Sequence, residues 1–288
     1  MVNGFAGKYL DVNLTDNLVR TFPVDMSIAK KFVGGLTYGL YLLWKRTKPD
    51  IDPLSPRNLL FFNTGPISGL VGTSRGTVVF KSPLTGLIGH SESGGHWASE
   101  LKFAGYDGIV LSGKAEKPVY LWIDDDSVQL LDAQYLWGKS PQETEDAIKK
   151  ELKDFYIRVA SIGVAGEKLV RIACVINEKS RACGRTGLGA VMGSKSLKAI
   201  AVRGTDGLEF AQPDELRDYC KEMNDMIIGT RWAKAQSKWG TMIIYSNTNT
   251  TGLIRTKNFQ LNRLEHGEDL DPEVIDRYSF GTSGCYGC

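Results

Sequence analysis

Two glycine-rich segments, KSPLTGLIGHSESGG at residues 81–95 and NEKSRACGRTGLGAVMG at residues 177–193, decide how this chain is organised. Each follows a strand-like apolar run and mixes glycines with hydroxyl and basic side chains. Glycine lets the main chain approach a ligand closely, and backbone N–H groups then cradle an anion. Two such segments predict one large, doubly anionic ligand held between two related halves.

Composition limits the class of protein. The chain has 288 residues, of which 42% are hydrophobic and 24% charged, so we expect one or two soluble globular domains. A net charge of +2 argues against a nucleic-acid surface. No apolar run approaches the roughly 20 residues that span a bilayer, and the first ten residues contain no secretory signal. Five cysteines, an odd number, fit a reducing compartment, so we expect a cytoplasmic protein without membrane contact.

The first 208 residues contain an internal repeat, about 1–115 and 116–208. Each half begins with an alternating strand–turn–strand pattern, and a helix follows at about 26–33 or, after the capping box Ser140–Glu143, up to about Leu152. Three further strand-like runs occur in each half: 59–62, 77–80 and 108–111, then 157–162, 172–176 and 199–202. Any α+β protein can give such a parallel by chance, but the matching order and glycine-segment positions favour duplication.

The pattern becomes helical beyond residue 208. From Pro213 onward, apolar residues recur on one helical face, and further helices are expected at 231–245 and 272–278. We therefore predict a domain boundary near 208, with residues 209–288 forming the beginning of a helical domain that carries a C-x-x-C motif.

The second glycine-rich segment contains candidate phosphate ligands. Arg181 and Arg185 can pair with phosphate oxygens, and Gly184, Gly187 and Gly189 free the backbone to approach. Residues 188–192 can open a helix whose positive end faces the anion. The segment matches neither a P-loop nor the G-x-G-x-x-G dinucleotide pattern. The alternative is a glycine-rich turn in a packed core.

The first glycine-rich segment is preceded by Arg75 and contains Glu92. A main-chain carbonyl in this segment can ligate a hard cation that bridges phosphates. His90 and His96 lack a second ligand cluster, so we do not predict zinc here. Cys174, Cys183 and Cys220 are most simply buried or partly buried small residues.

The chain stops on Cys285-Tyr-Gly-Cys288, a spacing shared by zinc sites, iron–sulfur sites and redox disulfides. The flanking glycines and tyrosine resemble a turn that wraps a cluster. A thioredoxin-like motif needs a preceding strand, which residues 279–283 do not supply. A chain that ends here looks like the front part of something longer.

Several blocks along the chain resemble the aldehyde ferredoxin oxidoreductase family. They are KSPLTG at 81–86, SGG at 93–95, ELKFAGYD at 100–107, GKAEKPVY at 113–120, GAVMGSK at 189–195 and KNF at 257–259. The resemblance covers essentially the whole chain but only the front part of that family's subunit. It implies tungstopterin, in which tungsten (less often molybdenum) is held by the dithiolene sulfurs of two pterins, and a 4Fe–4S cluster. The cofactor rather than the protein would then supply the sulfur ligands of the active metal.

The resemblance also implies roles for individual residues. Arg75 corresponds to an arginine between a pterin and the cluster, a candidate bridge for electrons. The implied pterin-binding positions are Arg75, Glu92, Gly94, Arg181, Ala182, Gly184 and Arg185. Main-chain carbonyls of Glu92 and Ala182 would ligate a magnesium ion that joins the pterin phosphates. Cys285 and Cys288 match the first two cluster ligands.

Two positions depart from the family pattern. Position 92 is commonly asparagine, which leaves a carbonyl role intact, and Cys183 stands where alanine is usual. The remaining cluster cysteines and the catalytic acid–base residues are expected beyond residue 288.

We therefore expect an α+β fold, in which two antiparallel sheets form a base for the cofactor before a helical domain begins. The implied reaction oxidises a small aldehyde to a carboxylate and passes electrons to ferredoxin or another iron–sulfur carrier, in a homodimer or larger oligomer. One alternative is a cofactor-binding or assembly subunit without catalysis of its own. Another is a family relative that reduces aromatic thioesters.

Overall fold

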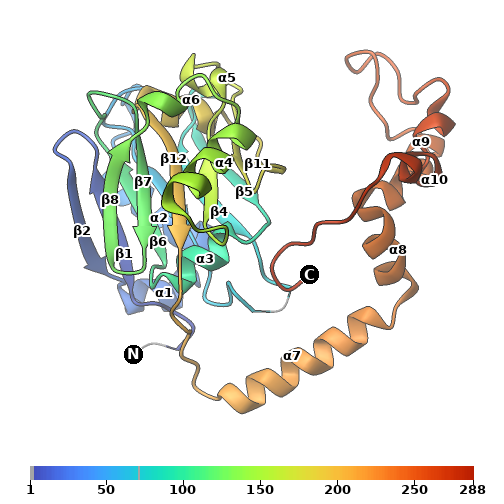
Figure 1. Cartoon of the computed structure of the whole chain (residues 1–288), viewed down its shortest axis with the longest axis horizontal. Helices are drawn as coiled ribbons and strands as arrows, with labels where there is room; N and C mark the ends of the chain where they lie inside the picture. Colours follow the sequence, from blue (N-terminus) through green and yellow to red (C-terminus); the bar gives the residue numbers. More distant parts are fainter. Residues whose placement is uncertain (1–2, 71) are drawn as a thin grey trace. The chain divides into compact units, whose positions relative to one another are not determined.

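The computed structural model describes residues 3–70 and 72–288. The chain divides into two compact units, the first comprising Met1–Pro213 with Cys285–Cys288 and the second Asp214–Gly284 (Figure 1). The division falls at Pro213, near the position expected from the sequence. The C-x-x-C motif differs from expectation, because it packs with the first unit and not with the helical segment that precedes it.

The first unit contains two six-stranded sheets, one from each half of the sequence. The strands of the first sheet are β1 (Lys8–Asn13), β2 (Leu18–Pro23), β3 (Leu60–Asn63), β4 (Gly76–Lys81), β5 (Ile88–Ser93) and β6 (Gly108–Ser112). Those of the second are β7 (Val119–Asp124), β8 (Ser127–Asp132), β9 (Arg158–Ser161), β10 (Val175–Asn177), β11 (Arg181–Cys183) and β12 (Leu197–Arg203).

The two sheets share one topology. The strand order is β2-β1-β6-β3-β4-β5 in the first and, read in the same sense, β8-β7-β12-β9-β10-β11 in the second. Only β1–β6 and β7–β12 pair in parallel among the named strands, and the other neighbours are antiparallel. This shared order supports the interpretation that the halves are repeats.

The α+β class is confirmed, but the sheets are mixed rather than wholly antiparallel. In each half the last strand enters the centre of the sheet, between the first and third strands. There it runs in the same direction as the first strand. Parallel pairing of this kind requires a long connection between the two strands, which local alternation cannot reveal.

Helices connect the strands at corresponding places in the two halves. The first half contains α1 (Met26–Phe32), α2 (Gly35–Arg46) and α3 (Trp97–Phe103); the second contains α4 (Pro141–Leu152), α5 (Val164–Glu167) and α6 (Leu188–Ser194). The predicted capping box of α4 is confirmed: the Ser140 hydroxyl accepts from the Glu143 N–H at 3.2 Å, and the Glu143 carboxylate accepts from the Ser140 N–H at 2.8 Å. Helix α2 was not predicted, because Gly34–Gly35 reads as a helix end. In the structure the Gly34–Gly35 pair instead links α1 to α2, and Gly34 lies in the left-handed region at φ +99°.

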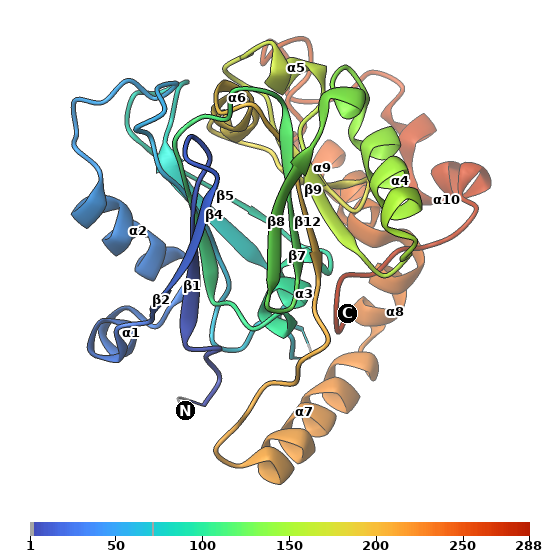
Figure 2. The ribbon, with the colours of Figure 1, turned by 60° about the vertical axis from the view of Figure 1, so that its left-hand side comes forward.

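The hydrophobic core forms three layers around the sheets. The central layer joins Phe62 and Ile109 of the first sheet to Ile200 of the second, with α3 and α6 packed between them. Alternate residues of the first sheet face α2, and those of the second face α4. Figure 2 shows α2 and α4 on opposite sides of the paired sheets. Both sheets are therefore covered on their two faces, which places α3 and α6, and the loops before them, at the junction of the halves.

The second unit is helical, with α7 (Pro213–Ile228), α8 (Arg231–Trp239), α9 (Tyr245–Thr250) and α10 (Pro272–Ile275). The helix predicted from Pro213 is confirmed. Its apolar face is not buried, since Tyr219 is 59% and Met226 66% exposed.

Candidate functional site

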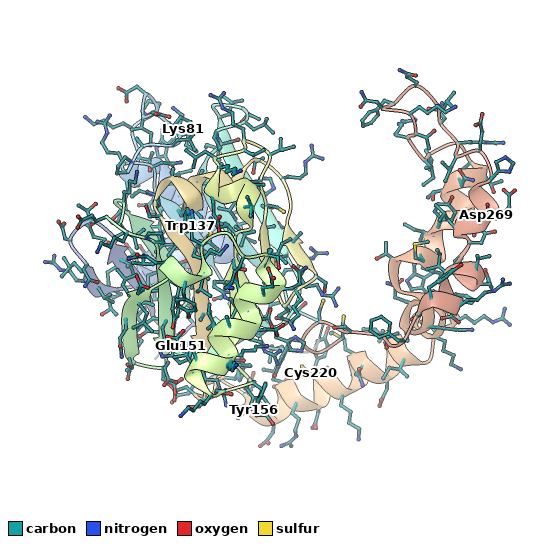
Figure 3. All side chains as sticks on the ribbon, turned by 45° about the horizontal axis from the view of Figure 1, so that its top comes forward. Lys81, Trp137, Glu151, Tyr156, Cys220 and Asp269 are labelled. Carbon is teal, nitrogen blue, oxygen red and sulfur yellow. The ribbon has the colours of Figure 1, made fainter. Side chains whose placement is uncertain are left out.

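The fold brings the two glycine-rich segments together. The Ser82 hydroxyl donates to the Thr186 carbonyl at 2.7 Å, and the Thr186 hydroxyl donates to the His90 carbonyl at 3.2 Å. At the start of the first segment, Lys81, labelled in Figure 3, donates to the Ile51 carbonyl at 2.7 Å. The halves thus meet through the segments that the sequence singles out.

Strands β5 and β11 occupy equivalent positions in their sheets, at one edge and next to β4 or β10. Each is followed by a glycine-containing loop and then by α3 or α6. Glu92 and Ala182 are the penultimate residues of these two strands. Their main-chain carbonyls, implied as magnesium ligands, therefore belong to matching places in the two halves.

The implied cofactor-binding side chains lie at the surface of the first unit. Arg75, Glu92, Ala182, Gly184 and Arg185 are exposed, and Gly94 and Arg181 are half-buried. The Arg185 N–H donates to the Ser91 hydroxyl at 3.4 Å, which ties the second segment to β5. Exposed or half-buried guanidinium groups beside glycine-containing loops suit a phosphate-bearing ligand.

Two glycines of the second segment serve packing instead of ligand approach. A Cβ at Gly187 would lie 2.2 Å from the Arg171 carbonyl oxygen, and one at Gly189 would lie 2.5 Å from the Cys174 oxygen. The Gly189 N–H donates to the Ala173 carbonyl at 2.9 Å, so this part of the helix start is already satisfied. The packed-turn interpretation therefore holds for these positions. Gly184 differs, because a Cβ there would meet nothing closer than 3.9 Å.

Cys183, the last residue of β11, is buried. Burial raises the pKa of its thiol to about 11, although hydrogen bonds with Ser93 and Ser91 partly oppose this shift. The group therefore remains a neutral thiol at neutral pH. It packs as a small residue, as its sequence context predicts.

The C-x-x-C motif forms a turn that docks beside the first glycine-rich segment. The Tyr286 N–H donates to the Gly95 carbonyl at 3.1 Å, and the Gly72 N–H donates to the Gly287 carbonyl at 3.2 Å. A Cβ at Gly94 would lie only 2.8 Å from the Cys285 sulfur. Cys285 is half-buried, Cys288 is exposed and both thiols are free. Residues 279–284 form no strand, so a thioredoxin-like setting is lacking.

Sequence reasoning missed the residues that hold these loops in place. The Asn177 side chain donates to the Gly94 carbonyl at 2.9 Å, and the Glu178 carboxylate accepts from the Trp97 N–H at 2.8 Å. Both residues belong to the second half, and both partners belong to the first. The only sequence signal was their position at the beginning of the second segment.

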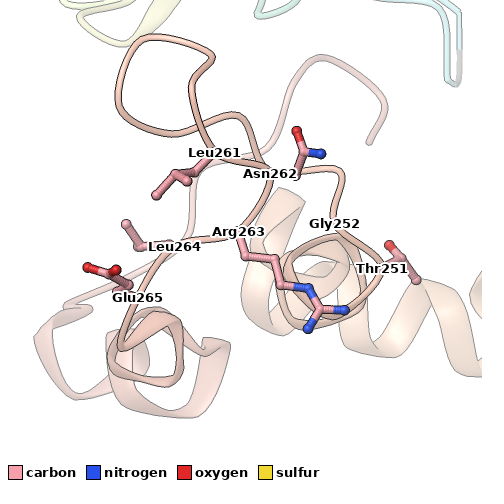
Figure 4. Close-up of a pocket in the computed structure, with 7 residues that line it drawn as sticks. All are labelled: Thr251, Gly252, Leu261, Asn262, Arg263, Leu264 and Glu265. Atoms are coloured by element: carbon pink, nitrogen blue, oxygen red, sulfur yellow. The ribbon is translucent and has the colours of Figure 1, made fainter.

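Two cavities among the described residues are lined by other residues than the implied cofactor-binding ones. A cavity of about 470 Å³ in the second unit is lined by residues 251–252 and 261–265 (Figure 4). Another of about 350 Å³ lies beside the turn at 83–86 and Arg171. Within residues 3–70 and 72–288, no group of three or more His, Cys, Asp or Glu side chains could hold a metal ion.

Comparison with known proteins settles the family. The model of the aldehyde ferredoxin oxidoreductase N-terminal domain matches residues 9–204. The chain belongs to the aldehyde ferredoxin oxidoreductase family. The match includes both sheets almost completely, both glycine-rich segments and the helices between them.

Members of the family with curated names extend beyond this chain. It is 42% identical over 289 residues to a tungsten-containing aldehyde ferredoxin oxidoreductase of Pyrococcus abyssi, covering 99% of the chain and 48% of the relative. The chain is also 36% identical over 248 residues to an aliphatic sulfonate oxidoreductase, WOR-like subunit, of Pyrococcus furiosus. This match covers 79% of the chain and 40% of the relative. The chain thus spans about half the length of the curated relatives it matches.

A solved structure extends the likeness to the full chain. The active-site complex BamBC of benzoyl coenzyme A reductase, bound to 1,5-dienoyl-CoA, superposes with a TM-score of 0.87 at 34% identity. The match covers 100% of this chain and 46% of that one. Separately, none of the helices in the described part of the chain is long and apolar enough to cross a membrane.

Proposed function

We propose that this chain is the cofactor-binding front part of a tungsten (or molybdenum) bis-pterin oxidoreductase that oxidises aldehydes to carboxylates. The observation that carries this proposal is the meeting of two glycine-rich segments at equivalent edge strands of two matching sheets. A ligand with two similar anionic arms suits such a repeated site. Membership of a family with tungsten-containing relatives supports tungstopterin as this ligand.

The residues present suit a bis-pterin cofactor. Arg181 and Arg185 would pair with phosphate oxygens, while Gly94 and Gly184 would let the main chain approach. The carbonyls of Glu92 and Ala182 would ligate magnesium. Since the Glu92 side chain is exposed, its difference from the usual asparagine leaves that carbonyl unchanged.

The terminal turn fits the role of half a cluster site. Cys285 and Cys288 would supply two of the four thiolates of a 4Fe–4S cluster, the other two being expected beyond residue 288. Arg75 would lie between cluster and pterin. Arg75 occupies the short stretch between Gly72 and Gly76. The Gly72 N–H donates to the Gly287 carbonyl in the Cys285–Cys288 turn (the thiol turn), and Gly76 pairs with Ser93 of β5.

The overall reaction converts an aldehyde and water into a carboxylate, three protons and two electrons. The bound metal centre supplies the two-electron redox chemistry, and this chain contributes binding, orientation and electrostatics. We infer that ferredoxin or a similar iron–sulfur carrier accepts the electrons, in the cytoplasm, from a homodimer or larger assembly.

A second candidate is reduction of aromatic thioesters. It is favoured by the TM-score of 0.87 to the benzoyl coenzyme A reductase complex over the whole of this chain.

The metal, iron and pterin content of the purified full-length protein tests the proposal, together with aldehyde oxidation using ferredoxin as acceptor. We expect tungsten or molybdenum, two pterins per metal and iron with acid-labile sulfide. Benzoyl-thioester turnover without aldehyde oxidation would favour the second candidate. Stoichiometric zinc without iron would contradict the electron-transfer role of the thiol turn.

A further inference from the structure

Glu178 makes a concentrated set of contacts across the junction of the two halves. One carboxylate oxygen, Oε1, accepts from the backbone N–H groups of His96 and Trp97, the latter at 2.8 Å. The other, Oε2, lies 2.8 Å from His96 Nδ1. Glu178 belongs to the turn between β10 and β11, whereas His96 and Trp97 begin α3 of the first half. The Glu178 side chain of the second half therefore caps the start of α3 in the first half.

Neighbouring residues complete the same junction. Asn177, which is buried, donates to the Gly94 carbonyl at 2.9 Å. Gly95 has φ +102°, and a Cβ there would lie 2.9 Å from both Asn177 Nδ2 and Glu178 Oε1. The side chains of Asn177 and Glu178 thus both bind residues 94–97. Only glycine at position 95 leaves room for these two side chains.

The backbone of this turn favours glycine, yet it carries larger residues. Glu178 and Lys179 both lie in the left-handed region, at φ +49° and +63°. Glycine adopts this conformation without the steric cost that a side chain incurs. A carboxylate at a strained backbone position, with all of its contacts on the other half, points to a role for the side chain itself.

The thiol turn rests on the residues that this junction holds. Tyr286 donates its N–H to the Gly95 carbonyl at 3.1 Å. Its ring meets His96 edge-on, with ring centroids 6.0 Å apart, and Phe103 with centroids 5.5 Å apart. Cys285 and Cys288 flank this anchoring tyrosine.

We propose that Glu178 is a positioning residue: it clamps residues 94–97 and, through His96 and Gly95, sets the place of the Cys285–Cys288 turn. A carboxylate of the second half would thereby fix both a loop at the pterin site and the thiols, without touching either ligand. The consequence for iron depends on the proposed function, whereas the clamp does not.

Three variants of the full-length protein separate the possible roles. Glu178→Gly relieves the left-handed backbone but removes the carboxylate. Glu178→Gln keeps one oxygen for both backbone N–H groups. Asp146→Asn is a matched control, because Asp146 pairs at 2.5 Å with Lys179 of the same turn.

Hydrogen exchange followed by mass spectrometry reads the clamp directly in peptides covering 94–104 and 279–288. We expect Glu178→Gly to speed exchange at His96, Trp97 and Tyr286 by about tenfold or more, and Glu178→Gln to restore most of the protection. Asp146→Asn should match wild type. If glycine at 178 preserves protection, the residue only shapes the turn and the proposal is wrong. Equal acceleration in β3 and β4 would also overturn it, since that marks general destabilisation.

Iron content gives the second readout. Iron should fall at least twofold in Glu178→Gly and remain near wild type in Glu178→Gln. A wild-type protein without iron would contradict the proposed function while the exchange comparison still decides the clamp.

Discussion

Lys195, at the end of α6, is a fully buried lysine whose ammonium donates to the carbonyls of Pro56 and Gly113, both at 3.0 Å. Burial lowers its pKa from the ordinary 10.5 to about 7. Desolvation disfavours the charged form, so the folded protein releases a proton that the unfolded chain keeps.

This lysine makes stability depend on pH. Between its folded pKa of about 7 and its unfolded pKa of 10.5, the unfolded state binds more protons, so stability rises with pH; below 7 the burial cost is fully present. From pH 8 to 9 we expect wild type to gain up to about 1.4 kcal/mol relative to Lys195→Met. Urea unfolding at several pH values measures the difference. Parallel pH profiles for the two proteins would show that Lys195 is not the group responsible.

Arg181 and Arg185 are the residues whose charge should matter most for the proposed cofactor. Replacing either with alanine removes a charge-assisted phosphate contact, which weakens pterin binding by about 1.5–3 kcal/mol. Tungsten and pterin content after purification checks this loss. Arg171→Ala, which changes another exposed arginine of the second half, serves as the control. Full retention in both variants would remove the phosphate assignment.

At the scale of one element, α6 shows how glycine can serve the fold rather than the ligand. All seven residues of the helix are buried, and Gly189 and Gly193 would place a Cβ 2.5 and 2.0 Å from backbone oxygens of Cys174 and Gly166. The helix fits between the sheets only because positions 189 and 193 carry no side chain.

A matched pair of substitutions distinguishes packing glycines from ligand glycines. Gly189→Ala should lower stability by about 1–3 kcal/mol through overpacking. Gly184→Ala should alter stability little, since its nearest neighbour lies 3.9 Å from the new Cβ. Thermal or urea unfolding gives stability, and pterin content gives binding. Equal losses of stability in the two variants would contradict the distinction.

At the scale of the whole molecule, the chain returns to its first unit at residue 285 after the helical segment. The thiol turn is anchored by Tyr286, through its N–H bond to Gly95 and its ring contacts, rather than by the thiols. Exchanging a thiol for a hydroxyl should therefore leave the turn in place.

Cys285→Ser tests the cluster assignment under these conditions. We expect the full-length variant to lose most of its iron and visible absorption, because a thiolate ligand is missing. Pterin content should remain close to wild type, since residues 94–97 keep their contacts. Iron and sulfide assays with pterin fluorescence measure both effects. Unchanged iron would exclude Cys285 as a ligand.

Local sequence patterns determined a large part of this protein. Alternating patterns and apolar runs predicted most strands, the Ser140–Glu143 box predicted the start of α4, and the mixture of glycine, hydroxyl and basic residues identified the two glycine-rich segments. Each of these signals depends on neighbours within a few residues, so it survives without knowledge of the fold.

Only the tertiary structure decided which segments meet. It placed β6 and β12 in the centre of mixed sheets, gave Gly187 and Gly189 a packing role and joined Glu178 to His96 across the two halves. The tertiary structure also places the Cys285–Cys288 turn in the first unit. These outcomes depend on hydrogen bonds and steric contacts between residues far apart in the chain, and such pairings leave no periodic pattern in a single sequence.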